Sequence, residues 1–226
     1  MNKNIKIRFL SFLCISLCLS FFCGCERTSP YEKYVSELRS DIFFGETENY
    51  KVYAFYGFKE TPSINDGIVG DRVYFLEFRI QNSGEDGIKR TINFSFKGES
   101  YSEDFSLDYS TGIYSAKIEL TDFAEKEITA VILSGAEKET ITLVSSLPEN
   151  SLTFKDALKK LKETQEDLLS LYKNPQREFS GEIRMRILLK DDTPYWYVGL
   201  CGESGKIKAL LLDGYTGKVL AVREIF

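Results

Sequence analysis

The chain has 226 residues, of which 34 are acidic and 29 are basic, and it contains no histidine. The resulting formal charge of −5 argues against a nucleic-acid-binding protein, which needs a basic surface. The lack of histidine excludes Ser-His-Asp and Cys-His catalysis and any metal site that uses a histidine ligand.

The first 25 residues predict an export signal. A basic head with Lys3, Lys6 and Arg8 precedes an apolar segment, residues 9–23, which is interrupted by serines. This order is typical of a secretory signal. The apolar segment is too short for a spanning helix, which needs about 20 apolar residues.

The end of this signal, Phe22-Cys23-Gly24-Cys25, resembles the lipobox of bacterial lipoproteins, in which glycine or alanine precedes an invariant cysteine. Phe22 stands where the family usually has leucine. The resemblance implies cleavage before Cys25 and diacylation of its sulfur, which would anchor the protein to the extracytoplasmic face of a bacterial cell membrane. One acyl chain binds reversibly, whereas two or three hold stably. The alternative is an ordinary cleaved signal followed by a chance cysteine.

Cleavage would remove three basic residues and no acidic one, which takes the formal charge from −5 to −8. It would also remove Cys14, Cys18 and Cys23, while lipid would occupy Cys25. Cys201 is then the only free thiol, so we expect no intramolecular disulfide and no structural zinc. The sequence contains no calcium-loop or phosphate-loop motif, and we expect no cofactor.

Residues 25–40 predict a tether followed by a short helix over 31–40, whose apolar residues recur at i, i+3, i+4 and i+7. Residues 41–147 predict an immunoglobulin-like β-sandwich, because apolar and polar residues alternate in about seven segments separated by turn signals. The expected strands are 51–56, 74–80, 92–96, 102–107, 114–120, 128–133 and 140–145. The Cys…Trp…Cys signature of true immunoglobulin domains is missing, so the topology stays open.

Residues 148–226 predict a second, α+β domain. Thr153 is the expected N-cap of a helix that ends at Asn174-Pro175. Four strands follow and offer one sheet face for the helix to cover. Their expected positions are residues 183–189, 194–202, 207–212 and 219–225.

This second domain resembles the PepSY domain. The resemblance rests on the hairpin Asp213-Gly214-Tyr215-Thr216-Gly217-Lys218-Val219-Leu220 and on the aromatic strand Tyr195-Trp196-Tyr197-Val198 before it. Gly214 stands where the family more often has alanine. The resemblance implies a non-catalytic binding or inhibitory module that restrains an extracellular peptidase or binds a peptide. The alternative is an ordinary hairpin in which Gly217 adopts positive φ.

We therefore expect a lipid-anchored, non-enzymatic binding protein of the cell envelope, held at the membrane through Cys25. Its partner would be an envelope protein or peptidase. Tyr195, Trp196 and Tyr197 are the candidate binding residues, because aromatic side chains are common at interfaces. Packing between the two predicted domains is the plainer reason for their presence.

Two alternatives stay open, a carboxylate-based envelope hydrolase and a structural accessory of an envelope complex. A hydrolase would need a pair of carboxyl groups on either side of a scissile bond. The candidate acids lie in or near turns, where acids are ordinarily solvated, and no spacing selects a pair. These candidates are Asp66, Asp71, Asp86, Glu99 and Asp104.

Overall fold

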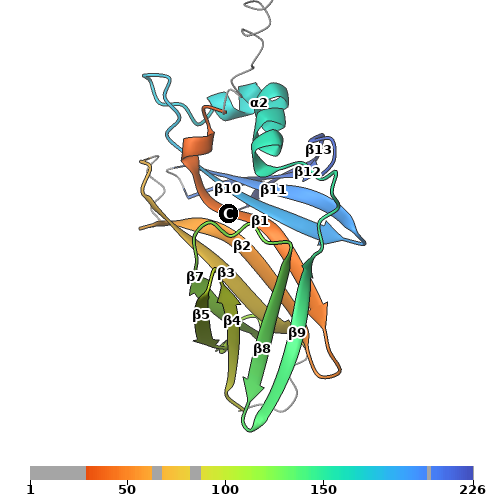
Figure 1. Cartoon of the computed structure of the whole chain (residues 1–226). Coiled ribbons are helices and arrows are strands. Elements are labelled where there is room, and N and C mark those ends of the chain that lie inside the picture. The colour runs from red at the N-terminus through yellow and green to blue at the C-terminus, as the bar shows by residue number, and fades with distance from the viewer. Residues whose placement is uncertain (1–28, 63–67, 82–87, 203–204, 226) are drawn as a thin grey trace, which may run out of the picture. The chain divides into compact units, whose positions relative to one another are not determined.

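The computed structural model describes residues 29–62, 68–81, 88–202 and 205–225. Residues 31–226 form one compact unit (Figure 1). Strands make up 58% and helices 11% of the structure, so its class is mostly β. The elements are η1 Glu32–Tyr34, β1 Val35–Glu46, β2 Lys51–Thr61, β3 Asp71–Gln81, β4 Arg90–Phe96, β5 Glu99–Asp104, β6 Ser106–Asp108, β7 Ile113–Glu119, β8 Glu127–Ser134, β9 Glu137–Ser145, α2 Phe154–Ser170, β10 Glu182–Lys190, β11 Thr193–Cys201, β12 Ile207–Asp213 and β13 Val219–Ile225.

Strand β1 joins two parts of one continuous sheet. Its first residues, Val35–Arg39, pair in parallel with β10, whereas Phe43 and Phe44 pair antiparallel with β9. The curved sheet has the order β5-β4-β8-β9-β1-β2-β3-β7-β6, and the helix-covered sheet has the order β13-β12-β11-β10-β1. The register of β1 against β2 shifts between Arg39 and Asp41. This irregularity lies between the residues of β1 that pair with β10 and those that pair with β9.

The curved sheet is nearly closed around its own core. Apolar side chains at alternate strand positions fill this core, as the period-two patterns predict. Its members include Val52, Leu76, Phe78, Ile92 and Leu143, each at most 3% exposed.

In the helix-covered sheet, α2 packs on one face of the strands and covers the core instead, as Figure 1 shows at the top of the molecule. Thr153 caps this helix, because its side chain accepts a hydrogen bond from the Asp156 N–H at 3.2 Å. Leu158 and Leu161 are fully buried against the sheet. The Trp196 indole N–H donates to the Leu152 carbonyl at 3.0 Å, so this buried ring is both packed and hydrogen-bonded.

The predicted combination of an immunoglobulin-like β-sandwich with a separate helix-and-sheet, PepSY-like domain is wrong. The described residues instead form one nearly closed, mainly antiparallel sheet with one α-helix. The parallel pairing of β1 with β10 is the reason, because it connects the two strand sets across residue 148. The buried residues of the two cores still divide near this position, except that β1 and β2 contribute to both cores and Tyr31 belongs to the core under α2.

The helix predicted over residues 31–40 is also wrong, apart from the single 3-10 turn η1. Residues from Val35 onward belong to β1, which pairs with three other strands. A register shift after Val35 places Val35 and Leu38 in the same core, and this spacing also fits a helix. Tertiary pairing therefore decided between two structures that the local pattern permits.

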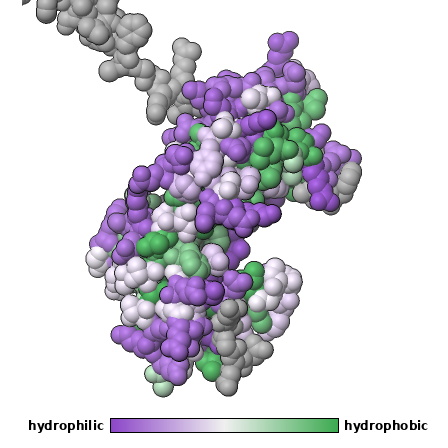
Figure 2. All heavy atoms as spheres, turned by 90° about the vertical axis from the view of Figure 1, so that its right-hand side faces the viewer, coloured by the Kyte–Doolittle hydropathy of each residue, from purple (hydrophilic) through white to green (hydrophobic). Residues whose placement is uncertain are grey.

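Figure 2 shows the side of the molecule at the right of Figure 1. Hydrophilic residues cover most of it, and its outline is indented at mid-height. Among the described residues, no helix is both long enough and apolar enough to cross a membrane.

Candidate functional site

The curved sheet has a seam where one bent segment, residues 99–108, crosses from one side of the sheet to the other. Its first part, β5, pairs with β4, and its last part, β6, pairs with β7. Phe105 lies at the bend, where its N–H donates to the Arg90 carbonyl at 2.9 Å. The first part of the segment, β5, therefore does not pair with β7, and in the described structure its strand partner is β4 alone.

The second half of β7 forms the opposite edge of this seam. Residues 116–119 pair with β3 on one side, whereas β6 reaches only as far as Ser115 on the other. The Leu120 N–H donates to the Tyr74 carbonyl at 3.1 Å, so it points toward β3. Backbone groups alternate in direction along an antiparallel strand. The N–H and carbonyl groups of Lys117 and Glu119 therefore point toward the seam.

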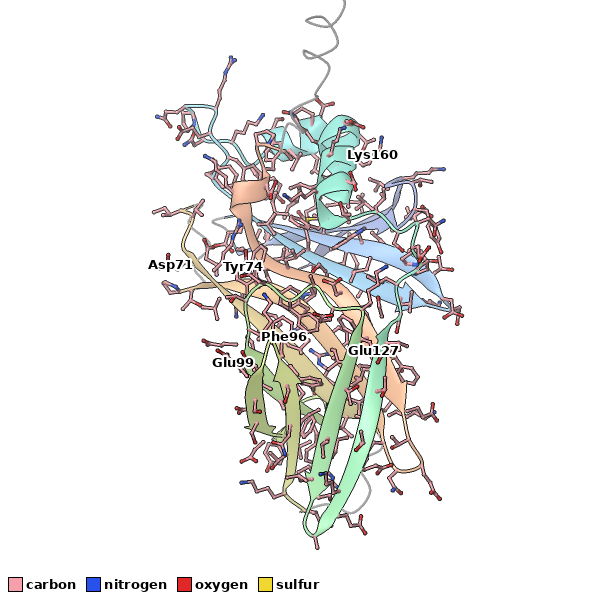
Figure 3. The ribbon with its side chains drawn as sticks, in the orientation of Figure 1. Asp71, Tyr74, Phe96, Glu99, Glu127 and Lys160 are labelled. Carbon is pink, nitrogen blue, oxygen red and sulfur yellow. The ribbon has the colours of Figure 1, made fainter. Side chains whose placement is uncertain are left out.

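A pocket of about 550 Å³ lies at this seam, which we call the seam pocket. This volume falls in the range of ordinary small-ligand sites. Figure 3 shows Tyr74, Phe96 and Glu99 close together there, with Lys160 well away from them. The lining residues are Arg72, Val73, Tyr74, Phe96, Lys97, Glu99, Tyr101, Glu119, Leu120, Thr121 and Asp122.

Aromatic rings form the wall of the seam pocket and continue into the core. Tyr101 stacks on Phe94 with 5.1 Å between ring centroids. The ring centroids of Phe96 and Phe123 are 5.2 Å apart, and those of Phe123 and Tyr56 are 5.4 Å apart. The pocket is thus lined by rings whose positions are fixed by core packing, which reduces the entropy lost on binding.

The lining residues carry charges of both signs. Lys97 and Arg72 are basic, whereas Glu99, Glu119 and Asp122 are acidic. Arg72 is held in place, because its guanidinium donates to three backbone carbonyls in and beside η1 and lies 4.5 Å from an aromatic ring centre of β2. Such a mixture suits a ligand with both donor and acceptor groups.

Tyr101 and Glu99 form a hydrogen-bonded pair on β5. The Tyr101 hydroxyl donates to the Glu99 carboxylate at 2.7 Å, and this bond raises the pKa of the tyrosine. The pair therefore offers carboxylate oxygens and a phenol side by side to a ligand.

The three aromatic residues predicted to bind a partner lie outside the seam pocket, on β11. Trp196 is 1% exposed and belongs to the core under α2. Tyr195 and Tyr197 lie on the opposite face of the strand and are half-buried. Burial raises the pKa of Tyr197. Their binding role stays a prediction.

The predicted lipidation site, Cys25, lies outside the described residues. Cys201 is fully buried, as its strand pattern predicts, and burial raises the pKa of its thiol. A raised pKa lowers the thiolate fraction and makes the residue a poor nucleophile.

Of the five predicted candidate acids, one lines the pocket. Glu99 is at the seam, whereas Asp71 and Asp104 are not among the lining residues, and Asp66 and Asp86 lie outside the described residues. Within the described ranges, no group of three or more cysteine or acidic side chains is arranged to hold a metal ion.

The hairpin that suggested a PepSY domain is a tight turn docked on the helix. The Asp213 carboxylate accepts hydrogen bonds from the Tyr215 and Thr216 N–H groups and from the Thr216 hydroxyl. Gly217 has φ +72°, and a Cβ there would lie 2.6 Å from the Lys160 Cβ. The motif therefore has a structural role that needs no ligand.

Sequence reasoning missed Phe96, Lys97, Tyr101, Glu119 and Asp122. A usable signal was the segment 99–104, in which three of six residues are acidic. Charged, exposed strands are typical of sheet edges, where charge discourages uncontrolled pairing. An edge prediction would have indicated a break in the sheet at this position.

Comparison with known proteins gave no match to any family model, curated protein or solved structure.

Proposed function

We propose that the protein is a lipid-anchored binding protein of the bacterial cell envelope that takes up an extended peptide segment of a partner protein in the seam pocket. The proposed lipid anchor is based on the lipobox-like end of the signal at Cys25. The proposed peptide ligand is based on the geometry of the seam. One observation carries the proposal: a pocket with aromatic walls lies against a strand edge whose backbone groups are left without a strand partner in the described structure.

An extended peptide satisfies both features of this pocket. Its main chain can pair with the Lys117 and Glu119 backbone groups, as in other complexes where a peptide adds a strand to a free edge. Its side chains then alternate between solvent and the rings of Tyr74, Phe96 and Tyr101. Main-chain pairing supplies affinity, and the aromatic wall supplies selectivity.

The test is selection of linear nonapeptides from a random displayed library by the full chain in lipid nanodiscs. We expect enriched peptides whose binding is abolished by Glu119→Pro, because proline removes the N–H that faces the seam and leaves the bonds to β3. Glu119→Ala is the matched control, since it removes the carboxylate but keeps the N–H. Equal binding by both variants, or no enrichment, would contradict the proposal.

The anchor has a separate test. Cys25→Ser should block processing or release the protein from membranes into the soluble fraction. Unchanged processing together with unchanged membrane retention would count against a lipid on Cys25, whatever the seam binds.

A carboxylate-based hydrolase is the second candidate, because Glu99, Glu119 and Asp122 line the same pocket. It predicts release of reducing ends from cell-wall glycan, and it predicts that Glu119→Gln or Glu99→Gln abolishes this release. If the wild-type protein releases no reducing ends, the hydrolase is excluded.

A further inference from the structure

A row of arginines crosses one face of the sheet, on the side of the strands opposite Phe78 and Leu38. Arg79 of β3, Arg39 of β1 and Arg186 of β10 alternate along their strands with core residues such as Phe78 and Leu38. The strands lie in the order β3-β2-β1-β10, so the three side chains follow one another across the sheet. We call these three residues the arginine row.

Two glutamates connect the arginine row. Arg79 and Arg39 both contact Glu77, at 2.6 and 3.1 Å, and Arg186 contacts Glu37 at 3.0 Å. Arg39 also lies 3.7 Å from Glu37, so the five side chains form one chain of ion pairs. The row contains three cations for two anions, in a protein whose overall charge is negative.

In every one of these pairs the carboxylate lies deeper than the guanidinium. The exposed fractions are 31% for Arg79 against 11% for Glu77, and 41% for Arg186 against 12% for Glu37. Arg39 is 19% exposed. The glutamates therefore hold the arginines from below, and the surface offered to a ligand is cationic.

Crowding of the arginines is also evident at Arg39. Burial lowers the pKa of this residue, and Arg79 and Arg186 lower it further, while Glu77 and Glu37 act in the opposite direction. An anion bound over the row would relieve this repulsion. Arginine is suited to the task, because its planar fork binds carboxylates in a defined geometry.

The spacing of the row selects the kind of anion. Successive guanidiniums share one carboxylate, Glu77 between Arg79 and Arg39 and Glu37 between Arg39 and Arg186. Two guanidiniums that contact the two sides of one carboxylate lie about 7 Å apart. An extended peptide rises about 3.4 Å per residue, so its side chains at i, i+2 and i+4 are also about 7 Å apart on one face. The interleaved glutamates disfavour a polymer with continuous negative charge, and the partly buried arginines are poorly placed to reach a flat bilayer.

We propose that the arginine row is a second binding site, which takes an acidic extended segment of a partner protein with carboxylates at alternate positions. The Phe55 ring lies under the row, with its centre 5.0 Å from the Arg79 guanidinium and 5.8 Å from that of Arg39. This ring gives the guanidinium planes a fixed support.

The test uses the full chain in nanodiscs of neutral phosphatidylcholine, at low salt. The probes are two peptides of equal composition, one with Thr-Glu repeated three times and one with three Thr followed by three Glu. We expect the alternating peptide to bind about tenfold more tightly than the block peptide. Arg186→Gln and Arg79→Gln should each weaken it by about tenfold, the usual effect of losing one charged hydrogen bond.

Two controls separate binding at the arginine row from general charge attraction and from binding in the seam pocket. Lys138→Gln removes an exposed cation of β9, and Glu119→Pro blocks the seam edge, so both should leave the affinity unchanged. Arg186→Lys, which keeps the charge and lowers the risk of misfolding, should retain part of the affinity. Equal binding of the two peptides, or no effect of the arginine variants, overturns the proposal. So does stronger arginine-dependent binding to phosphatidylglycerol vesicles than to the alternating peptide.

Discussion

The two parts of the sheet bury their cores in different ways. The helix-covered sheet uses α2, whose fully buried leucines pack on its strands, and the docked turn at Gly217 lies against that helix. The curved sheet uses only its own curvature, and its bent segment leaves a seam with a pocket beside it. This difference indicates where a ligand can be taken up, because backbone groups without a strand partner lie at the seam.

The largest expected effect tests whether the two parts unfold together. Phe78→Ala in the curved sheet removes a fully buried ring and should lower the free energy of unfolding by about 3–5 kcal/mol. Trp196 is the only tryptophan and lies under α2, so its fluorescence reports the other part. Because both parts share β1, we expect the fluorescence and circular-dichroism midpoints in urea to fall together. An unchanged fluorescence midpoint would show that the parts unfold independently.

Two glycines with positive φ offer the next comparison. Gly217 has φ +72°, and a Cβ there would collide with Lys160, whereas Gly135, in the β8–β9 turn, has φ +59° and open space where a Cβ would lie. Gly135→Ala should lower the free energy of unfolding only by the strain of a left-handed backbone, about 1 kcal/mol. Gly217→Ala adds a steric conflict and should lower the free energy of unfolding by clearly more. Equal losses in thermal or urea unfolding would show that the turn is not tightly docked on α2.

Capping of α2 should contribute a smaller amount. Thr153→Ala removes the acceptor for the Asp156 N–H and should destabilise the protein by about 1 kcal/mol. Thr153→Ser, which keeps the hydroxyl, is the control and should behave almost as the wild type in urea unfolding. A loss of similar size in both variants would assign the effect to the methyl group.

The smallest effect concerns two acids on β1, the strand that both parts share. Burial acts to raise the pKa of Glu37, but Arg186, with Arg39 and Arg184, outweighs it and lowers that pKa below its ordinary value. Glu37 should therefore stabilise the protein above its unfolded-state pKa, and this contribution should be lost as the pH falls through the lowered value. Glu37→Gln should be destabilising at pH 7 and much less so at pH 3.

Asp41 should show the opposite behaviour. Burial raises its pKa, despite a hydrogen bond from Ser40, so the charged form is disfavoured in the folded protein. Asp41→Asn should stabilise the protein at neutral pH, and the gain should vanish as the pH falls through the raised value toward the unfolded one. Urea unfolding between pH 7 and pH 3 measures both variants, and parallel pH profiles would contradict this assignment.

The sequence predicts most strands, because alternation at positions such as Ile92, Phe94 and Phe96 reflects burial on one face only. It also predicts the Thr153 cap and the buried state of Cys201. It does not predict β1, whose apolar spacing fits a helix equally well until its strand partners are known. The fold class predicted from the sequence is therefore wrong, although the predicted positions of the individual strands are nearly right.

The candidate site was harder to predict than the strands. Glu119 and Lys117 belong to the site through their backbone groups, and a side-chain pattern carries no information about which strand edge is left open. The bend at Phe105 divides what the sequence presents as one strand, residues 102–107, between two partners. The arginine row likewise depends on the order of β3, β2, β1 and β10, which alternation alone does not determine.

Amide hydrogen exchange across β7 tests the central claim most directly. In the free protein, the Lys117 and Glu119 amides should exchange quickly, whereas the Ile118 and Leu120 amides, which face β3, should be protected. A saturating nonapeptide from the library selection should protect Lys117 and Glu119 and leave Ile118 and Leu120 unchanged. Binding of that peptide without new protection at Lys117 and Glu119 would contradict the claim that the seam takes up an extended segment.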